Sequence, residues 1–146
     1  MRKLIRKLDA LGIIYESITF GCSYFYDIPP VTVPAVRITV YYTDGENDVN
    51  GLREIERYCK RYGYHIKRYG HMWGACYEIC TGADYDRLAT YQAYRDKSAA
   101  VCDMEIHIRR TAGTAETSAE FNDRLRGIMA FYAAEYATAI AEGVTA

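Results

Sequence analysis

The spacing of its strand-like segments most limits how this 146-residue chain can fold. Runs rich in β-branched and aromatic residues predict strands at 13–20, 35–42, 64–69 and 75–81. Apolar side chains at helical spacing predict an amphipathic helix before each pair of strands, at 2–11 and 50–62. Because neighbouring segments are close in sequence, we expect the four strands to form a single antiparallel sheet.

Two longer helical segments follow the last strand. We expect the first from about Asp84, as its N-cap, to about Arg110, and the second from about Ser118 to Glu142. These two helices should form a C-terminal helical hairpin. The order α-β-β-α-β-β-α-α predicts an α+β fold with an antiparallel four-stranded sheet and helices packed mainly on one face. No obvious linker divides residues 1–146, so we expect a single α+β domain.

Helical periodicity also predicts which side chains face the core. In the first two helices they are Leu4, Ile5, Leu8, Leu11, Leu52, Ile55, Cys59 and Tyr62. In the last helix they are Phe121, Leu125, Ile128, Tyr132 and Tyr136. All three prolines fall between Gly21 and Pro34, and proline cannot donate a hydrogen bond to a sheet. That segment is therefore expected to be a connection or a frayed edge.

Charge and cysteine content narrow the class of protein. Eighteen Lys and Arg residues nearly balance 19 Asp and Glu residues, for a formal net charge of −1, which argues against polyanion binding by the whole molecule. The five cysteines are an odd number, and the N-terminal residues lack the apolar core of a signal peptide, so we expect a reducing, cytoplasmic location. No apolar run approaches the ~18 residues of a membrane span, so no membrane partner is expected.

Tyrosine is the residue type most informative about function. The chain has 15 tyrosines, and four of them lie among the cations between Arg53 and Tyr69. Tyrosine and arginine dominate protein-binding hot spots, while cations and aromatic rings together also suit nucleic acid. A solvated helix surface followed by a strand with half-buried tyrosines is a third interpretation. We predict partner binding by Arg57, Arg61, Tyr62, Tyr64, Lys67, Arg68, Tyr69, Met72 and Trp73.

The turn between the last two predicted strands holds the only tryptophan, Trp73, beside Met72. An aromatic residue at a hairpin tip either packs back on the sheet or is offered to a partner. Exposed, the two side chains would make a natural anchor, because Met adapts to a surface and Trp fills a pocket. We expect substitution of Tyr69 or Trp73 by alanine to weaken partner binding with little effect on thermal stability.

The acidic turn at 44–50 permits three interpretations. Its alternating carboxylates are similar to a calcium-binding loop, but such a loop needs a bidentate glutamate where Arg57 stands. A turn leading into the second helix fits better. The carboxylates could also imitate phosphates toward a basic partner, so either this turn or the basic, aromatic tract could make the contact.

A small metal-binding or thiol enzyme is the remaining alternative, using His71, Cys76, Cys80 or His107. Cys76 and Cys80 lie four residues apart on a predicted strand, roughly 13 Å from each other, which is too far for one metal ion. No nucleophile elbow, phosphate-binding loop, dinucleotide fingerprint or zinc-protease motif is present. We therefore expect no catalytic residues, metal or cofactor, and a chain that is not an enzyme.

In general character the chain resembles the small accessory proteins of phages and mobile elements, including the anti-CRISPR inhibitors. The resemblance lies in short length, tyrosine-rich hairpins and a basic helix before an aromatic strand. It implies a non-enzymatic protein-binding module that occludes a bacterial nucleic-acid-handling enzyme, such as a CRISPR nuclease of the Cas9 class. The alternative is a direct nucleic-acid-binding protein that uses the basic, aromatic residues 53–73.

Overall fold

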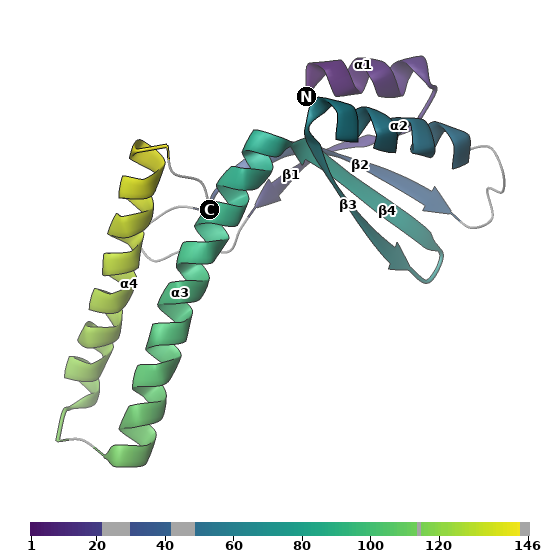
Figure 1. Ribbon diagram of the computed structural model, residues 1–146. Helices are drawn as coiled ribbons and strands as arrows, with labels where there is room; N and C mark the ends of the chain where they lie inside the picture. Colours follow the sequence, from purple (N-terminus) through teal and green to yellow (C-terminus); the bar gives the residue numbers. More distant parts are fainter. Residues whose placement is uncertain (22–29, 42–48, 114, 144–146) are drawn as a thin grey trace. The chain divides into compact units, whose positions relative to one another are not determined.

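The computed structural model describes residues 1–21, 30–41, 49–113 and 115–143. The four described helices are α1 (Arg2–Ala10), α2 (Val49–Tyr62), α3 (Gly82–Ala112) and α4 (Ser118–Ala141). The four strands are β1 (Glu16–Gly21), β2 (Thr32–Tyr41), β3 (Tyr64–His71) and β4 (Gly74–Thr81). The predicted α+β fold, with its order α-β-β-α-β-β-α-α, is confirmed (Figure 1).

The described chain divides into two compact units. The first comprises Met1–Phe20 and Thr32–Tyr85, and the second comprises Gly21–Val31 and Asp86–Ala146. The first unit holds the sheet with α1 and α2, and the second is built mainly from α3 and α4. The single-domain expectation stays a prediction, because compactness alone does not show whether the units fold independently.

The sheet of the first unit has the strand order β1-β2-β4-β3. Strands β2 and β3 both run antiparallel to β4, so they are parallel to each other with β4 between them. Helix α2 makes the connection between these two parallel strands, as crossover connections usually do. The β3–β4 hairpin therefore sits at one end of the strand order, and its turn joins His71 to Gly74.

The main core lies between one face of the sheet and the helices α1 and α2 (Figure 1). Alternate residues of the strands face the helices because strand side chains have a period of two. The buried members from the helices are Leu4, Leu8, Leu52, Ile55 and Cys59. Those from the strands include Val36, Ile38, Ala75, Tyr77 and Ile79. The predicted stripes of the first two helices are thus confirmed except at Tyr62, which is 54% exposed because it stands on the last turn of α2.

For residues 21–34 the sequence predicted a connection or a frayed edge, and at Pro34 the first of these alternatives is wrong. The strand β2 begins at Thr32, so Pro34 lies inside it and not in a connection. Pairing with β4 starts only at Val36, opposite Ile79, so the missing N–H of Pro34 breaks no hydrogen bond to β4. Pro30 precedes the strand, and Pro29 lies outside the described residues.

The second unit confirms the predicted helical hairpin. Tyr91 of α3 is fully buried and contacts Tyr136 of α4, with ring centroids 5.3 Å apart in an edge-to-face arrangement. Ala133 completes this buried cluster, and Val31 packs against it. Of the predicted α4 stripe, Phe121 and Tyr136 are buried and the others are partly exposed.

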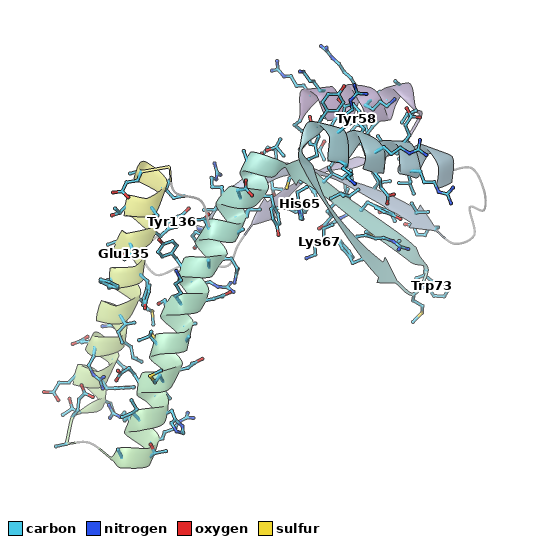
Figure 2. The ribbon with its side chains drawn as sticks, in the orientation of Figure 1. Tyr58, His65, Lys67, Trp73, Glu135 and Tyr136 are labelled. Carbon is cyan, nitrogen blue, oxygen red and sulfur yellow. The ribbon has the colours of Figure 1, made fainter. Side chains whose placement is uncertain are left out.

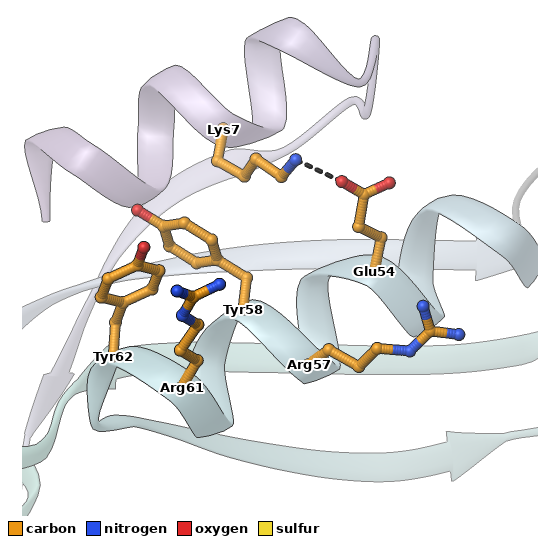
Figure 3. Close-up of a pocket in the computed structure, with 6 residues that line it drawn as sticks. All are labelled: Lys7, Glu54, Arg57, Tyr58, Arg61 and Tyr62. Atoms are coloured by element: carbon orange, nitrogen blue, oxygen red, sulfur yellow. Dashed lines mark hydrogen bonds and ion pairs between the residues drawn. The ribbon is translucent and has the colours of Figure 1, made fainter.

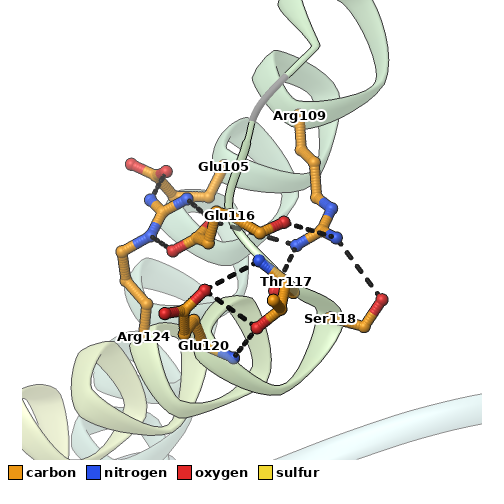
Figure 4. A network of polar contacts seen from close by, with 7 residues as sticks. All are labelled: Glu105, Arg109, Glu116, Thr117, Ser118, Glu120 and Arg124. Carbon is orange, nitrogen blue, oxygen red and sulfur yellow. Dashed lines mark hydrogen bonds and ion pairs between the residues drawn. The ribbon is translucent and has the colours of Figure 1, made fainter.

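Hydroxyl caps begin both long helices. Thr81 precedes α3, and its Oγ1 accepts from the backbone N–H of Asp84 at 3.1 Å, so Thr81 holds the capping role that the sequence assigned to Asp84. The Asp84 carboxylate accepts from the same hydroxyl at 2.6 Å. At α4, Thr117 forms a capping box with Glu120 (Figure 4). The observed caps lie three residues before Asp84 and one residue before Ser118, because the capping residue stands just outside the helix that it caps.

Candidate functional site

The turn of the β3–β4 hairpin presents two large side chains to solvent. Met72 is 81% exposed and Trp73 is 71% exposed. Figure 2 shows Trp73 at the far end of this hairpin. The sequence allowed the Trp73 side chain either to pack back on the sheet or to be exposed, and in the structure it is exposed. An exposed indole beside a thioether can fill an apolar pocket on another molecule.

The backbone of this turn is held against β2. Gly74 pairs with Tyr41, and a Cβ at Gly74 would lie 1.8 Å from the carbonyl oxygen of Val40. Only glycine allows an approach this close. The contact fixes where the turn stands relative to β2, and it therefore fixes where Met72 and Trp73 are presented.

Tyr69 belongs to a polar network on the sheet face that lies away from α1 and α2. Its hydroxyl donates a hydrogen bond to Glu78, which is only 8% exposed. Glu78 Oε1 also accepts from Nε and Nη2 of Arg37 at 3.0 and 2.7 Å, and Arg37 lies 3.6 Å from Glu16. Burial and the Glu78 carboxylate raise the pKa of Tyr69, and the hydrogen bond to Glu78 raises the pKa of Arg37. Tyr69 therefore stabilises the sheet through its hydroxyl.

The other predicted residues of β3 follow the alternation of the strand. Lys67 is exposed and stands opposite Glu78, on the same face as Tyr69. Arg68 stands opposite Tyr77 on the helix-covered face, with its guanidinium carbon 5.8 Å from the ring centroid. Tyr64 packs against the main core, and burial raises its pKa. Neighbours in this strand thus point to opposite sides of the sheet.

The three predicted residues of α2 lie together on the outer surface of the helix layer. Arg57, Arg61 and Tyr62 line a groove of about 320 Å³ with Lys7, Glu54 and Tyr58 (Figure 3). Lys7 forms an ion pair with Glu54 across the two helices. The Tyr58 hydroxyl donates to the backbone carbonyl of Lys3 at 3.4 Å. Helix α1 therefore supplies one side of the groove.

The nine predicted residues consequently do not form one surface. Arg57, Arg61 and Tyr62 share the outer surface of the helix layer, whereas Met72 and Trp73 form the hairpin tip. The remaining four are divided between the two faces of the sheet. The sequence analysis grouped these nine residues because they are close along the chain. In a strand, however, the side chains of successive residues point to opposite faces of the sheet.

Sequence reasoning missed the contribution of α1. None of its four cations, Arg2, Lys3, Arg6 and Lys7, is among the predicted binding residues. The signal that could have suggested a functional role was the shared pattern of α1 and α2, which both place cations opposite an apolar stripe. Two such helices on one sheet face combine their charges on the same surface.

The acidic turn at 44–50 lies largely outside the described residues. Residues 44–48 are not described, and the backbone of residues 49 and 50 opens α2. Neither the favoured interpretation, a turn leading into the second helix, nor its two alternatives, calcium binding and phosphate imitation, is tested by the described residues.

Three of the four described thiols, those of Cys59, Cys80 and Cys102, are buried. Cys80 is fully buried opposite His65, and the His65 ring stacks on Tyr85 with centroids 3.4 Å apart. Burial raises the pKa of Cys59 to about 12 and also raises the pKa of Cys102, so neither is poised to ionise. Among the described side chains, no group of three or more His, Cys, Asp or Glu residues could hold a metal ion.

Comparisons with known proteins add no family. No protein-family model, curated protein or solved structure matches this chain significantly. Among the described helices, none has the length and apolar character needed to cross a bilayer.

Proposed function

We propose that the chain is a non-enzymatic protein-binding module whose hairpin tip, Met72 and Trp73, docks into an apolar pocket of a protein partner. The exposure of Trp73, at 71%, is the observation that supports this most directly. Tryptophan is enriched among residues whose truncation costs an interface about 2 kcal/mol or more. At this exposure most of the indole surface is accessible to another molecule.

The anchoring of the tip favours binding. The Gly74 backbone, directly after Trp73, lies close to Val40, so the backbone at this end of the turn has less freedom to lose when a partner binds. Lys67 and Arg68 are exposed in the same hairpin. Cations beside an apolar anchor accelerate encounter with an acidic surface and help set the orientation of docking.

The proposed partner class is a bacterial nucleic-acid-handling enzyme, such as a CRISPR nuclease. The resemblance to phage accessory proteins and anti-CRISPR inhibitors suggests this class. Inhibition by occlusion requires a stable docking surface and no catalytic group. A tip that fills a pocket on the nuclease would block the path of nucleic acid by its bulk.

Paired variants test the proposal. The tip variant M72S/W73A and the control M104S/F131A each remove two exposed side chains, the control from α3 and α4. We expect a bacterial partner, identified by mass spectrometry, to be captured by the wild type and the control. Affinity of the purified partner for the tip variant should fall by about 30-fold or more. Equal affinity for both variants would contradict docking through the tip.

Inhibition is a separate readout. If the captured partner is a nuclease, the wild-type chain should suppress its cleavage of nucleic acid at stoichiometric concentration, and the tip variant should not. Binding without suppression would retain the docking surface and reject the role as an inhibitor.

A further inference from the structure

The near-neutral net charge conceals a strong segregation of charge. Helices α1 and α2 together carry eight basic and three acidic side chains, while the rest of the chain carries ten basic and sixteen acidic. All of the basic residues on the two helices are exposed except Lys7, which is half-buried. The sequence argument against polyanion binding relied on total charge, and the local excess of positive charge on this layer removes that argument.

The groove between the two helices concentrates this charge. Among the described residues that line it, Glu54 is the only acidic one, and the ion pair with Lys7 already neutralises its charge. Arg57 and Arg61 line the same groove and have no carboxylate partner among the residues that the structure describes. Their guanidinium groups keep hydrogen-bond donors that suit phosphate oxygens.

Aromatic rings accompany these cations. The Tyr58 and Tyr62 rings lie 4.6 Å apart between centroids, and the Arg61 guanidinium carbon lies 5.5 Å from the Tyr62 centroid (Figure 3). Tyr62 is 54% exposed, so part of its ring is accessible. A flat ring beside guanidinium groups offers a stacking surface and phosphate contacts within one groove.

We propose that the groove between α1 and α2 binds single-stranded nucleic acid. Arg57, Arg61 and the exposed α1 cations contact the phosphates, and an unpaired base stacks on Tyr62. Duplex DNA keeps its base faces stacked inside the helix and could use only the charges. An acidic peptide without aromatic side chains would use the charges but would have no flat base to stack on Tyr62.

This site is independent of the proposed hairpin tip. Figure 2 shows Tyr58 at the helix layer and Trp73 at the end of the hairpin, and no residue is shared between the two surfaces. A chain with both surfaces could hold a protein and its nucleic acid at the same time. Failure of either surface in its own test leaves the other intact.

Fluorescence anisotropy with labelled oligothymidylate of about 15 nucleotides and a duplex of the same length tests the proposal. At about 50 mM salt we expect oligothymidylate to bind more tightly than the duplex, and binding should weaken steeply at about 200 mM. R57E/R61E should bind at least tenfold more weakly. The control R110E/R126E makes the same charge change at exposed positions of α3 and α4, and should bind within about twofold of wild type.

Substitutions of Tyr62 separate stacking from charge. Y62A should weaken oligothymidylate binding by about tenfold and duplex binding much less, while Y62F keeps the ring and should bind like the wild type. Circular dichroism and thermal unfolding verify that each variant is folded. The tip variant M72S/W73A should bind oligothymidylate normally.

Three results would overturn the proposal. One is no binding of oligothymidylate at low salt. Another is equal loss of affinity in R57E/R61E and its charge-matched control. The third is tighter binding of the duplex than of oligothymidylate, in both the wild type and Y62A. That result would indicate a surface that recognises phosphates alone.

Discussion

Tyr69 shows how one hydroxyl can change the interpretation of a residue. It was predicted to be a docking residue that could be truncated without loss of stability, but its hydroxyl donates to Glu78, which is almost fully buried. We expect Y69F to lower the free energy of unfolding by about 1–2 kcal/mol, because the carboxylate loses a donor. Urea denaturation measures this. Y62F, on an exposed ring, is the control and should be neutral within about 0.5 kcal/mol.

Burial also predicts the order in which thiols react. With its pKa raised to about 12, Cys59 is almost entirely protonated at pH 8, and its side chain is inaccessible. Cys76 is only half-buried. In native protein, iodoacetamide followed by peptide mass spectrometry should therefore modify Cys76 before Cys59. The two should react at similar rates in denaturant, and early modification of native Cys59 would contradict the packing of α2 on the sheet.

At the scale of the element, the β3–β4 turn depends on Gly74. A Cβ there would overlap the Val40 carbonyl, so G74A should destabilise the fold by about 3 kcal/mol. Gly70 lies opposite Ala75 in the same hairpin and has open space around its Cβ position, so G70A is the matched control. Thermal unfolding should show a large fall in midpoint for G74A only. Equal thermal midpoints for G74A and G70A would mean that the close contact between Gly74 and Val40 does not constrain the fold.

The loop end of the α3–α4 hairpin should be sensitive to acid. Hydrogen bonds from Arg124 lower the pKa of Glu116, and bonds from Thr117 lower the pKa of Glu120 (Figure 4). A carboxyl group whose pKa is lower in the folded state stabilises the fold when ionised. Its contribution is complete above the unfolded value, about 4.3, and is lost as the pH falls below it.

Substitution of these carboxyl groups tests the acid sensitivity. In E116Q/E120Q the stability of the hairpin should depend less on pH between about 5 and 2 than in the wild type. The measurement is helical circular dichroism during urea unfolding at each pH. An identical pH dependence in both proteins would show that the two carboxyl groups do not stabilise the hairpin.

Element types and order could be predicted from the sequence because periodicity alone identifies strands and amphipathic helices. Leu4, Leu8, Ile55 and Cys59 were placed correctly in the core for the same reason. The position of α1 beside α2, and hence their shared groove, depends on tertiary packing that local patterns do not contain. The sequence also left the exposure of Trp73 undecided. The same turn sequence allows its side chain either to pack back on the sheet or to project into solvent.

At the scale of the whole molecule, the second unit is discontinuous in sequence. Val31 packs against the cluster of Tyr91 and Tyr136, although it lies far before both in the chain. A fragment of residues 86–146 should therefore have a lower thermal midpoint than the same fragment with residues 21–31 joined to it through a flexible linker. Circular dichroism of the two fragments measures the difference, and equal midpoints would show that residues 21–31 contribute nothing to the stability of the unit.

The same discontinuity has a consequence for folding during synthesis, which proceeds from the N-terminus. All strands and both helices of the first unit have been translated once Tyr85 is made, so the sheet can assemble while α3 and α4 are still unfinished. The cluster on which Val31 packs includes Tyr136, so it is complete only after α4 has been translated. The packing of Val31 is therefore completed later than the sheet of the first unit, although Val31 itself is made before most of that sheet.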